Sequence, residues 1–249
     1  WNVSNERFFQ SVSFVSGLKF RASWGRLGNQ EIGNYPYSSL IETGNFTYSF
    51  GDQIVTGAQL VEGGNANIRW ETTTQTNFGM DLSVWGERLT FIVDYFDKQS
   101  NDILVRVPVP QSGGAQNPPF VNAAQVENKG WEFSAIYKTK RQDFNWSVGA
   151  NLTALRNRVI SIAGGEPILG GFGLSDGPLT KTEPGHPIGS FFLWQMEGIF
   201  QSQEEIDNHA FQTSSTRPGD VKFADLNDDG VIDDKDRAHL GNPFPDFTY

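Results

Sequence analysis

The sequence predicts an all-β fold, organised as an antiparallel transmembrane β-barrel segment with long extracellular loops. Leucine-rich helical patterns are scarce in the 249 residues, whereas glycine, phenylalanine and tryptophan are abundant. Several stretches alternate apolar and polar residues with a period of two, as a strand with one apolar face does. Short turns and long polar loops follow one another along the chain, which is typical of membrane barrels.

The predicted strands share this alternation of apolar and polar side chains. They are residues 18–25, 77–84, 89–95, 131–138 and 144–154. Short polar turns are predicted at residues 85–88 and 139–143, and each joins two strands into a hairpin. Residues 26–68 and 97–128 are rich in Gly, Pro and Asn, so we expect two long loops, each with one short strand, at 46–50 and 103–107.

Aromatic residues distinguish a membrane barrel from a soluble β-sandwich. Trp85, Tyr137, Phe144 and Trp146 gather near the short turns. An amphipathic ring is stable where lipid headgroups meet hydrocarbon, so this grouping predicts an interfacial girdle. The simpler interpretation is that aromatic residues favour strands in general, and on that basis a soluble sandwich stays open.

Composition and charge exclude several classes of protein. The formal net charge of −10 argues against a nucleic-acid partner, because phosphate binding needs a basic surface. Cysteine is absent, which excludes disulfide scaffolds and thiol catalysis. No run of eighteen apolar residues predicts a transmembrane helix, although barrel strands need only about ten alternating residues. Because Trp1 stands in place of Met, we expect a fragment or a processed product.

The last third of the chain mixes loops with short elements. Residues 160–189 are rich in Gly and Pro, and residues 190–200 are expected to form a strand. A helix should begin after Ser202, because Glu205 follows three residues later. Residues 242–249 resemble the opening of another strand, so we expect the chain to be incomplete at that end.

Residues 225–236 have the spacing of an EF-hand calcium loop. Six of these twelve residues are Asp, and Gly230 occupies the sixth position, where the chain must turn sharply. The predicted metal ligands are Asp225, Asn227, Asp229, Val231 through its carbonyl group, Asp233 and Asp236. So many carboxylates beside the single cation Lys235 favour a hard divalent ion with oxygen ligands, hence Ca²⁺ in a structural role.

Two features set this loop apart from a sensor EF-hand. Its twelfth position is Asp236, whose reach is shorter than that of the usual Glu, and residues 221–224 alternate like a strand where a sensor has a helix. We therefore expect a lone calcium loop. A solvated acidic turn is the simpler alternative, because Asp, Asn and Gly commonly form turns.

Four sequence motifs resemble the SusC/RagA-type TonB-dependent outer-membrane transporters. They occur in the order of that family and cover nearly the whole chain. They are Leu18-Lys19-Phe20-Arg21-Ala22-Ser23-Trp24-Gly25 with Gly28-Asn29, Asn128-Lys129-Gly130-Trp131-Glu132, Gly185-His186-Pro187-Ile188-Gly189-Ser190-Phe191, and Pro218-Gly219-Asp220-Val221-Lys222-Phe223 running through the calcium loop to Gly241-Asn242-Pro243-Phe244-Pro245.

The resemblance implies that residues 1–249 are part of a TonB-dependent receptor barrel domain of twenty-two strands in a Gram-negative outer membrane. Residues 190–245 would form an external loop that contains the calcium loop. Implied partners are a SusD-like surface lipoprotein, TonB through parts of the protein outside this chain, outer-membrane lipid, and an oligosaccharide or peptide substrate. Under this interpretation, aromatic loop residues help to form the outer vestibule; they are Tyr35, Tyr37, Trp70, Phe120 and Phe172.

No enzymatic activity is expected from the sequence. His186, His209 and His239 lie in unrelated stretches, and no His-based metal motif, nucleophile elbow or phosphate-binding glycine loop occurs. The alternative function is a secreted, calcium-stabilised β-rich module that binds carbohydrate or acts like a dockerin. A dockerin carries two loops of this kind, and the sequence has one.

Overall fold

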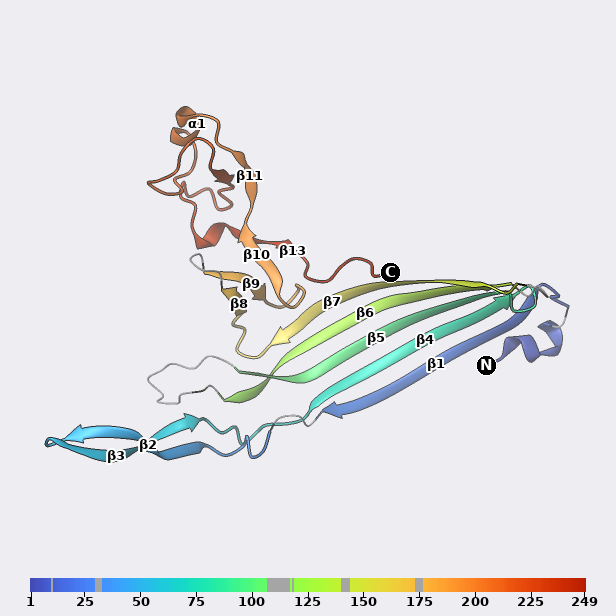
Figure 1. The fold of residues 1–249 in the computed structure, drawn as a ribbon, viewed down its shortest axis with the longest axis horizontal. Coiled ribbons are helices and arrows are strands. Elements are labelled where there is room, and N and C mark those ends of the chain that lie inside the picture. Colours follow the sequence, from blue (N-terminus) through green and yellow to red (C-terminus); the bar gives the residue numbers. More distant parts are fainter. Residues whose placement is uncertain (10, 30–32, 107–116, 118, 140–143, 173–176) are drawn as a thin grey trace. The chain divides into compact units, whose positions relative to one another are not determined.

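The structure is a computed structural model, and it describes residues 1–9, 11–29, 33–106, 117, 119–139, 144–172 and 177–249. Most of the described residues lie in antiparallel strands, as predicted (Figure 1). The chain divides into two compact units. Unit 1 comprises residues 1–165 and 246–249, and unit 2 comprises residues 166–245.

Unit 1 is built on a five-stranded sheet with the strand order β1-β4-β5-β6-β7. Its strands are long and each is antiparallel to its neighbours (Figure 1). Their bounds are Val15–Asn29 for β1, Glu71–Val84 for β4, Leu89–Arg106 for β5, Phe120–Lys138 for β6 and Ser147–Ile162 for β7. Two short 3₁₀ turns, η1 (Val3–Asn5) and η2 (Arg7–Phe9), precede the sheet.

The register gives the sheet two faces of opposite chemistry. One cross-strand row consists of apolar residues on all five strands: Phe20, Met80, Val93, Phe133 and Leu152. The next row, one residue away on each strand, contains Arg21, Asp94 and Glu132. Because successive side chains of a strand point to opposite faces, the apolar and charged rows lie on different sides of the sheet.

Large apolar side chains on this sheet are exposed, which is unusual for a water-soluble fold. Phe78 is 55% exposed and Trp131 47% exposed, and both belong to the apolar face. Contiguous apolar surface of this kind marks a contact with lipid or with another protein. The predicted alternation of residues therefore has the consequence expected of a membrane barrel strand, namely one apolar, exposed face.

Of the connections predicted for unit 1, one is confirmed and one is wrong. The turn between β4 and β5 lies at Trp85–Arg88, where Trp85, Gly86 and Glu87 have positive φ. The predicted loop at 97–128 is wrong, because β5 continues to Arg106 and β6 begins at Phe120. Polar pairs such as Asp97 opposite Lys129 extend the ladder beyond the apolar stretch. Most of the predicted turn at 139–143 lies outside the described residues.

A hairpin projects from the connection between β1 and β4 (Figure 1). It consists of β2 (Leu40–Phe50) and β3 (Gln53–Glu62), which pair with each other. The sequence predicted only a short strand at 46–50. The hairpin is longer because Thr, Val and Ile residues supply β-favouring side chains on both strands although their pattern alternates poorly.

Unit 2 consists of short elements. One sheet has the order β13-β10-β9-β8, and β11 pairs with β12. The bounds are Ile168–Phe172 for β8, Pro178–Thr182 for β9, Ser190–Trp194 for β10, Met196–Ile199 for β11, Gln203–Asp207 for helix α1, Val221–Phe223 for β12, Asp234–Asp236 for the 3₁₀ turn η4 and Arg237–Gly241 for β13. Phe200 and Asp236 are the most deeply buried side chains of this unit.

The sequence located β10, β11, β12 and α1 of unit 2, whereas it did not predict β8, β9 or β13. The strand predicted at 190–200 is interrupted at Gln195 and forms β10 and β11. Helix α1 begins where expected, and the Ser202 side chain accepts a hydrogen bond from the Glu205 N–H at 3.2 Å. No helix in the described part of the chain is long and apolar enough to cross a membrane.

The end of the chain returns to unit 1. Thr248 forms an antiparallel bridge with Thr153 of β7, with both backbone hydrogen bonds at 2.9 Å. Residues 242–249 were predicted to open a strand, and this bridge is the part of the prediction that the structure contains. Through this bridge, the end of the chain begins to pair with β7 on the sheet of unit 1.

Candidate metal centre

The predicted calcium loop lies between β12 and β13. The chain enters it from a strand, β12, and leaves it through η4, so the expected absence of an entering helix is confirmed. Gly230 has φ of +83° at the sharp turn, a conformation that a glycine adopts without steric cost. Asp228 also has a positive φ, which Asp tolerates better than most residues.

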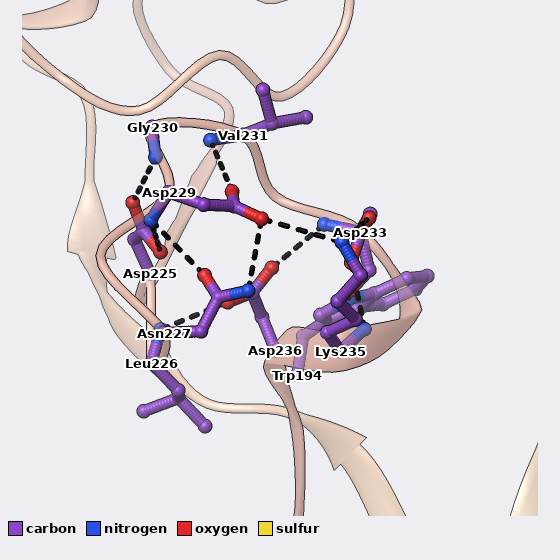
Figure 2. Close-up of polar contacts among 10 residues, drawn as sticks. All are labelled: Trp194, Asp225, Leu226, Asn227, Asp229, Gly230, Val231, Asp233, Lys235 and Asp236. Atoms are coloured by element: carbon purple, nitrogen blue, oxygen red, sulfur yellow. Dashed lines mark hydrogen bonds and ion pairs between the residues drawn. The ribbon is translucent and has the colours of Figure 1, made fainter.

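The first half of the loop folds around the Asp225 carboxylate. Its Oδ2 accepts a hydrogen bond from the Gly230 N–H at 2.8 Å, and its Oδ1 accepts one from Asp229 at 3.3 Å. The Asn227 Oδ1 also accepts from the Asp229 N–H, at 3.1 Å. Figure 2 shows these oxygens facing the interior of the loop, so the backbone turn and the candidate ligands are positioned by the same contacts.

The second half of the loop is closed by a capping box. The Asp233 Oδ1 accepts from the Lys235 N–H at 2.7 Å, and the Asp236 Oδ2 accepts from the Asp233 N–H at 2.8 Å. The Asp236 Oδ1 accepts from the Leu226 N–H at 2.9 Å, which joins the two ends of the loop. Asp236 is 0% exposed. Two N–H donors do not neutralise a buried carboxylate, so this position favours a cation nearby.

Charge inside the loop is partly balanced by neighbours. The side chain of Asn227 donates to Asp229 Oδ2 at 2.9 Å and the Val231 N–H donates to Oδ1 at 3.0 Å, and these contacts hold the pKa of Asp229 below its usual value. The Lys235 Nζ lies 3.4 Å from carboxylate oxygens of Asp233 and Asp229, which raise its pKa. The loop thus keeps Asp229 ionised, the state that binds a cation.

Two aromatic residues outside the loop hold it in place. The Trp194 Nε1 donates to the Asp233 carbonyl oxygen at 2.7 Å (Figure 2). Phe211 exchanges backbone hydrogen bonds with Gly230 and Ile232, both at 2.8 Å. The sequence analysis missed both anchors, because backbone contacts between distant segments leave no spacing pattern in a sequence.

By residue type, the donor set is one that a calcium ion takes. Among the described residues, carboxylate oxygens from three of the loop's Asp residues do not lie within 4.8 Å of one another, however, as the ligand atoms of Glu183, His186 and His239 do. Side-chain oxygens of all five predicted side-chain ligands are present in one loop: Asp225, Asn227, Asp229, Asp233 and Asp236 (Figure 2). For Val231, the predicted ligand is the carbonyl oxygen, and the structure describes its N–H, which donates to Asp229. Carboxylate, amide and carbonyl oxygens are the ligands that Ca²⁺ takes in such loops.

The sequence analysis was wrong about two of the histidines. His186 and His239 were assigned to unrelated stretches, yet their rings stack at 3.7 Å with an interplanar angle of 11°. Glu183 joins them in a group of three possible metal ligands. The two histidines are far apart in the sequence, and only the strand order of unit 2 brings them together. His209 lies apart from this group, beside Glu197 at 3.8 Å.

The aromatic residues expected in the outer vestibule differ in their surroundings. Tyr35 and Tyr37 pack edge to face at 6.1 Å, and Trp70 is exposed. Phe120 lies under the Arg106 guanidinium, 4.2 Å from the ring centroid, so its contact is a packing contact within unit 1. The side chain of Phe172 lies outside the described residues.

The sheet of unit 1 has one apolar, exposed face and one face with charged side chains, as a sheet of a transmembrane β-barrel does. Residues 1–183 match the family described as "TonB dependent receptor-like, beta-barrel". The chain belongs to this family of TonB-dependent receptors, which are outer-membrane proteins and transporters.

Relatives and solved structures agree with this family. The chain is 32% identical over 254 residues to TonB-dependent receptor P3 of Formosa agariphila and 30% identical over 257 residues to TonB-dependent receptor SusC of Bacteroides thetaiotaomicron. These matches cover 100% and 99% of the chain, but only 25% and 24% of the relatives. The chain therefore spans about a quarter of the length of the curated relatives it matches.

Three solved structures that resemble this chain are of one transporter complex, RagAB. The structure titled "Structure of the RagAB peptide transporter" matches with a TM-score of 0.68 and 27% identity, over 81% of this chain and 21% of that chain. The "closed-closed" state of the RagAB peptide importer matches over 99% of this chain and 26% of that chain, with a TM-score of 0.73; at 22% identity it supports the fold alone. Membership of this family argues against the alternative of a secreted module.

Proposed function

We propose that this chain is a barrel and extracellular-loop segment of a transporter that takes up glycans or peptides across the outer membrane with energy supplied through TonB. The carrying observation is the two-faced sheet. Its apolar face suits lipid, and its opposite face carries Arg21 with Asp81 and Asp94 at 2.8 and 2.9 Å. Charged side chains on a membrane sheet are tolerated where they face a water-filled lumen.

The complete protein would contain seventeen or so further strands, because the family resemblance implies a barrel of twenty-two. Its partners are a SusD-like surface lipoprotein and TonB, and its substrate is an oligosaccharide or a peptide. The RagAB complex is a peptide transporter, and this similarity supports a peptide as the substrate here. SusC is an equally good relative, and its name states no substrate.

Uptake by the full-length protein tests this proposal. Cells that express it with its neighbouring lipoprotein receive fluorescent oligosaccharide or peptide pools, in the presence and absence of TonB. We expect one pool to accumulate, and accumulation to stop without TonB. Equal accumulation without TonB, or none of either pool in intact cells, would contradict the proposal.

We also propose that residues 225–236 bind Ca²⁺ as a structural clamp. Support comes from the oxygen donor set, from the buried carboxylate of Asp236 and from the contacts that aim Asp225, Asn227 and Asp229 inward. The ion would link the end of β12 to η4. Its role is local, since the loop lies within unit 2.

Proteolysis with and without calcium tests the clamp. In the full-length protein, Ca²⁺ at a hundred times its Kd should slow nicking of the loop about 100-fold, and EDTA should abolish the protection. Asp225→Ala with Asp229→Ala should remove the protection but leave the barrel strands folded. Asp228→Asn is the matched control, because it removes a charge from a position that is not a ligand and Asn tolerates positive φ.

Two results would count against the clamp. One is nicking at the same rate with Ca²⁺ and with EDTA. The other is loss of the folded barrel in the double variant, which would show that the loop stabilises the transmembrane strands and not the external loop.

A further inference from the structure

The apolar face of the unit 1 sheet ends in an aromatic row, and a charged row follows it on the same side. The last apolar row consists of Ala22, Phe78, Tyr95, Trp131 and Ala154, which lie opposite one another on the five strands. Two residues further from the short β4–β5 turn, the next row consists of Trp24, Thr76, Asp97, Lys129 and Arg156. Residues two apart on a strand share a face, so these charges lie on the apolar side of the sheet.

Strand β7 carries two arginines on this side, Arg156 and Arg158. Both are exposed, whereas Asn157 between them and Val159 after them are buried, as the alternation of a strand requires. Two such residues lie about 7 Å apart along a strand. Within the part of the chain that the structure describes, neither guanidinium has a hydrogen-bond or ion-pair partner. The two side chains therefore present adjacent, unpaired positive charges.

The neighbouring strand β6 does not neutralise these arginines. Arg156 lies directly opposite Lys129, and like charges that face each other across a pair of strands are destabilising. The carboxylates of Glu127 and Asp97 lie 2.6 and 3.3 Å from the Lys129 Nζ, so both are paired with that lysine. An anion bound at Arg156 and Arg158 would remove the remaining imbalance of charge.

An apolar groove lies beside the charged row. It has a volume of about 690 Å³, and its walls include Phe20, Phe78, Tyr95 and Trp131. The Trp131 ring stacks on the Phe133 ring at 6.1 Å with an interplanar angle of 15°, which gives the groove a firm edge on β6. Trp131 is two residues from Lys129 on the same strand, so one edge of the groove is next to the positive charges.

Positive charge next to an apolar groove suits a lipid with an anionic headgroup. Guanidinium groups bind phosphate through paired hydrogen bonds, and a groove of aromatic rings suits an acyl chain. An arginine on the lipid side of a barrel is costly at the bilayer midplane and tolerated near the interface. Arg156 and Arg158 therefore belong at the level of the headgroups, directly beyond the aromatic row that bounds the apolar face.

We propose that Arg156 and Arg158 bind a phosphate group of an outer-leaflet lipid, and that an acyl chain of this lipid occupies the groove beside Trp131. The lipid class is lipid A, a phosphorylated disaccharide with several acyl chains. The proposal rests on the proposed function in one respect, namely that the long connections at this end of the sheet face outward. The bound phosphate offsets the repulsion between Arg156 and Lys129, so the lipid stabilises the pairing of β6 with β7.

Native mass spectrometry of the delipidated full-length protein in detergent tests the site. The protein is titrated with lipid A, with dephosphorylated lipid A and with phosphatidylglycerol. We expect lipid A to bind most tightly, with dephosphorylated lipid A at least about 10-fold weaker. Inorganic phosphate in excess should not displace lipid A, because a free anion does not fill the groove. TonB plays no part in this measurement, so its outcome is separate from that of the uptake experiment.

Arginine variants assign the headgroup contact. Arg156→Gln with Arg158→Gln should weaken lipid A binding about 10- to 30-fold, since each arginine near an anionic lipid contributes up to about one factor of ten. Arg156→Lys with Arg158→Lys keeps the charges but loses the planar donors, so its affinity should lie between the two. Arg88→Gln is the matched control, because it removes an exposed arginine at the short-turn end of the sheet, and it should bind normally.

Three results would overturn the proposal. One is lipid A binding that is equally tight in the double glutamine variant and in the unchanged protein. Another is equal affinity for lipid A and its dephosphorylated form, because the arginines would then not contact phosphate. The third is tighter binding of phosphatidylglycerol than of lipid A, which would assign the site to a different lipid. Heat modifiability on a semi-native gel confirms that each variant is folded before its affinity is compared.

Discussion

The two units of this chain are held together in different ways. Unit 1 relies on long antiparallel ladders: β6 alone pairs along nearly its whole length with both β5 and β7. In unit 2, the strands that the structure describes have three to five residues. Side chains complete its structure, as when Arg237 stacks on Trp194 at 4.0 Å and donates to the Pro178 carbonyl at 2.6 Å.

The difference follows from the surroundings of each unit. A strand in a membrane must satisfy its backbone groups through its neighbours, so a continuous ladder is obligatory in unit 1. Its apolar residues can then face outward. Unit 2 has short ladders, and polar side chains must satisfy the remaining backbone groups. We therefore expect the stability of unit 1 to fall when a substitution places atoms close to the backbone. We expect the stability of unit 2 to fall when a polar side chain is removed.

Gly130→Ala should cause the largest loss of stability. A Cβ at Gly130 would meet the Ala154 carbonyl oxygen at 2.5 Å and the Phe96 ring at 2.6 Å, so the β6–β7 ladder must shift. We expect a loss of about 3 kcal/mol in the free energy of unfolding, as for severe overpacking. The measurement is the temperature at which the folded barrel is lost on a semi-native gel.

Gly149→Ala on β7 is the control for this change. Its Cβ would meet its nearest neighbours at 3.7 and 3.8 Å, an ordinary contact distance. It should be close to neutral. Equal losses in both variants would show that glycine matters on these strands for a reason other than close approach.

Arg21→Met should have the next largest effect. The substitution leaves Asp81 and Asp94 without the guanidinium that bridges β1 to β4 and β5. Arg21 is 38% exposed on its side chain, so water screens the pair in part, and we expect a loss of about 1.5 kcal/mol. Thermal unfolding in detergent measures it. Adding Asp81→Asn and Asp94→Asn should restore part of the loss, and no recovery would show that the charges are not the cause.

Ser202→Ala tests a polar contact of unit 2. The change removes the side-chain cap of α1, and caps of this kind contribute about 1 kcal/mol. We expect faster hydrogen exchange at residues 203–207 with no change in unit 1. Ser202→Asp keeps a capping oxygen and should behave as the unchanged protein. Slower unfolding of α1 in the alanine variant would be the opposite of this expectation.

The smallest effect should be the pH dependence of the same helix. The Gln201 N–H donates to a carboxylate oxygen of Glu205 at 2.8 Å, and this hydrogen bond lowers the pKa of Glu205. Burial acts in the opposite direction, and the nearby Lys222 lowers the pKa further. Because its pKa is lowered in the folded state, the ionised Glu205 stabilises the fold at pH values above about 4.3, the ordinary pKa of Glu. This stabilisation is lost as the pH falls through the lowered pKa. Hydrogen exchange of α1 should accelerate in that window. In Glu205→Gln the acceleration should vanish, and its persistence would assign it to another group.

Sequence reasoning succeeded where the pattern is local. The period of two located the middle of β1 and the parts of β4, β5, β6 and β7 that lie next to the short turns, and the capping signature located α1. The strand ends were missed, because paired polar residues such as Asp97 and Lys129 look like a loop when the partner strand is unknown. The spacing of residues 225–236 gave the ligand candidates, since those residues are consecutive. His186 and His239 meet only through the β13-β10-β9 order, which the sequence does not encode locally.

The bridge between Thr248 and Thr153 has a consequence for the exchange of unit 2 between relatives. The chain leaves unit 1 after residue 165 and is back on β7 by Thr248, so unit 2 is an insertion whose two ends are fixed by the sheet. Doubling the length of a connection adds only about 0.6 kcal/mol of closure entropy. A graft of the whole insertion between relatives should therefore leave the pairing of β1, β4, β5, β6 and β7 unaltered.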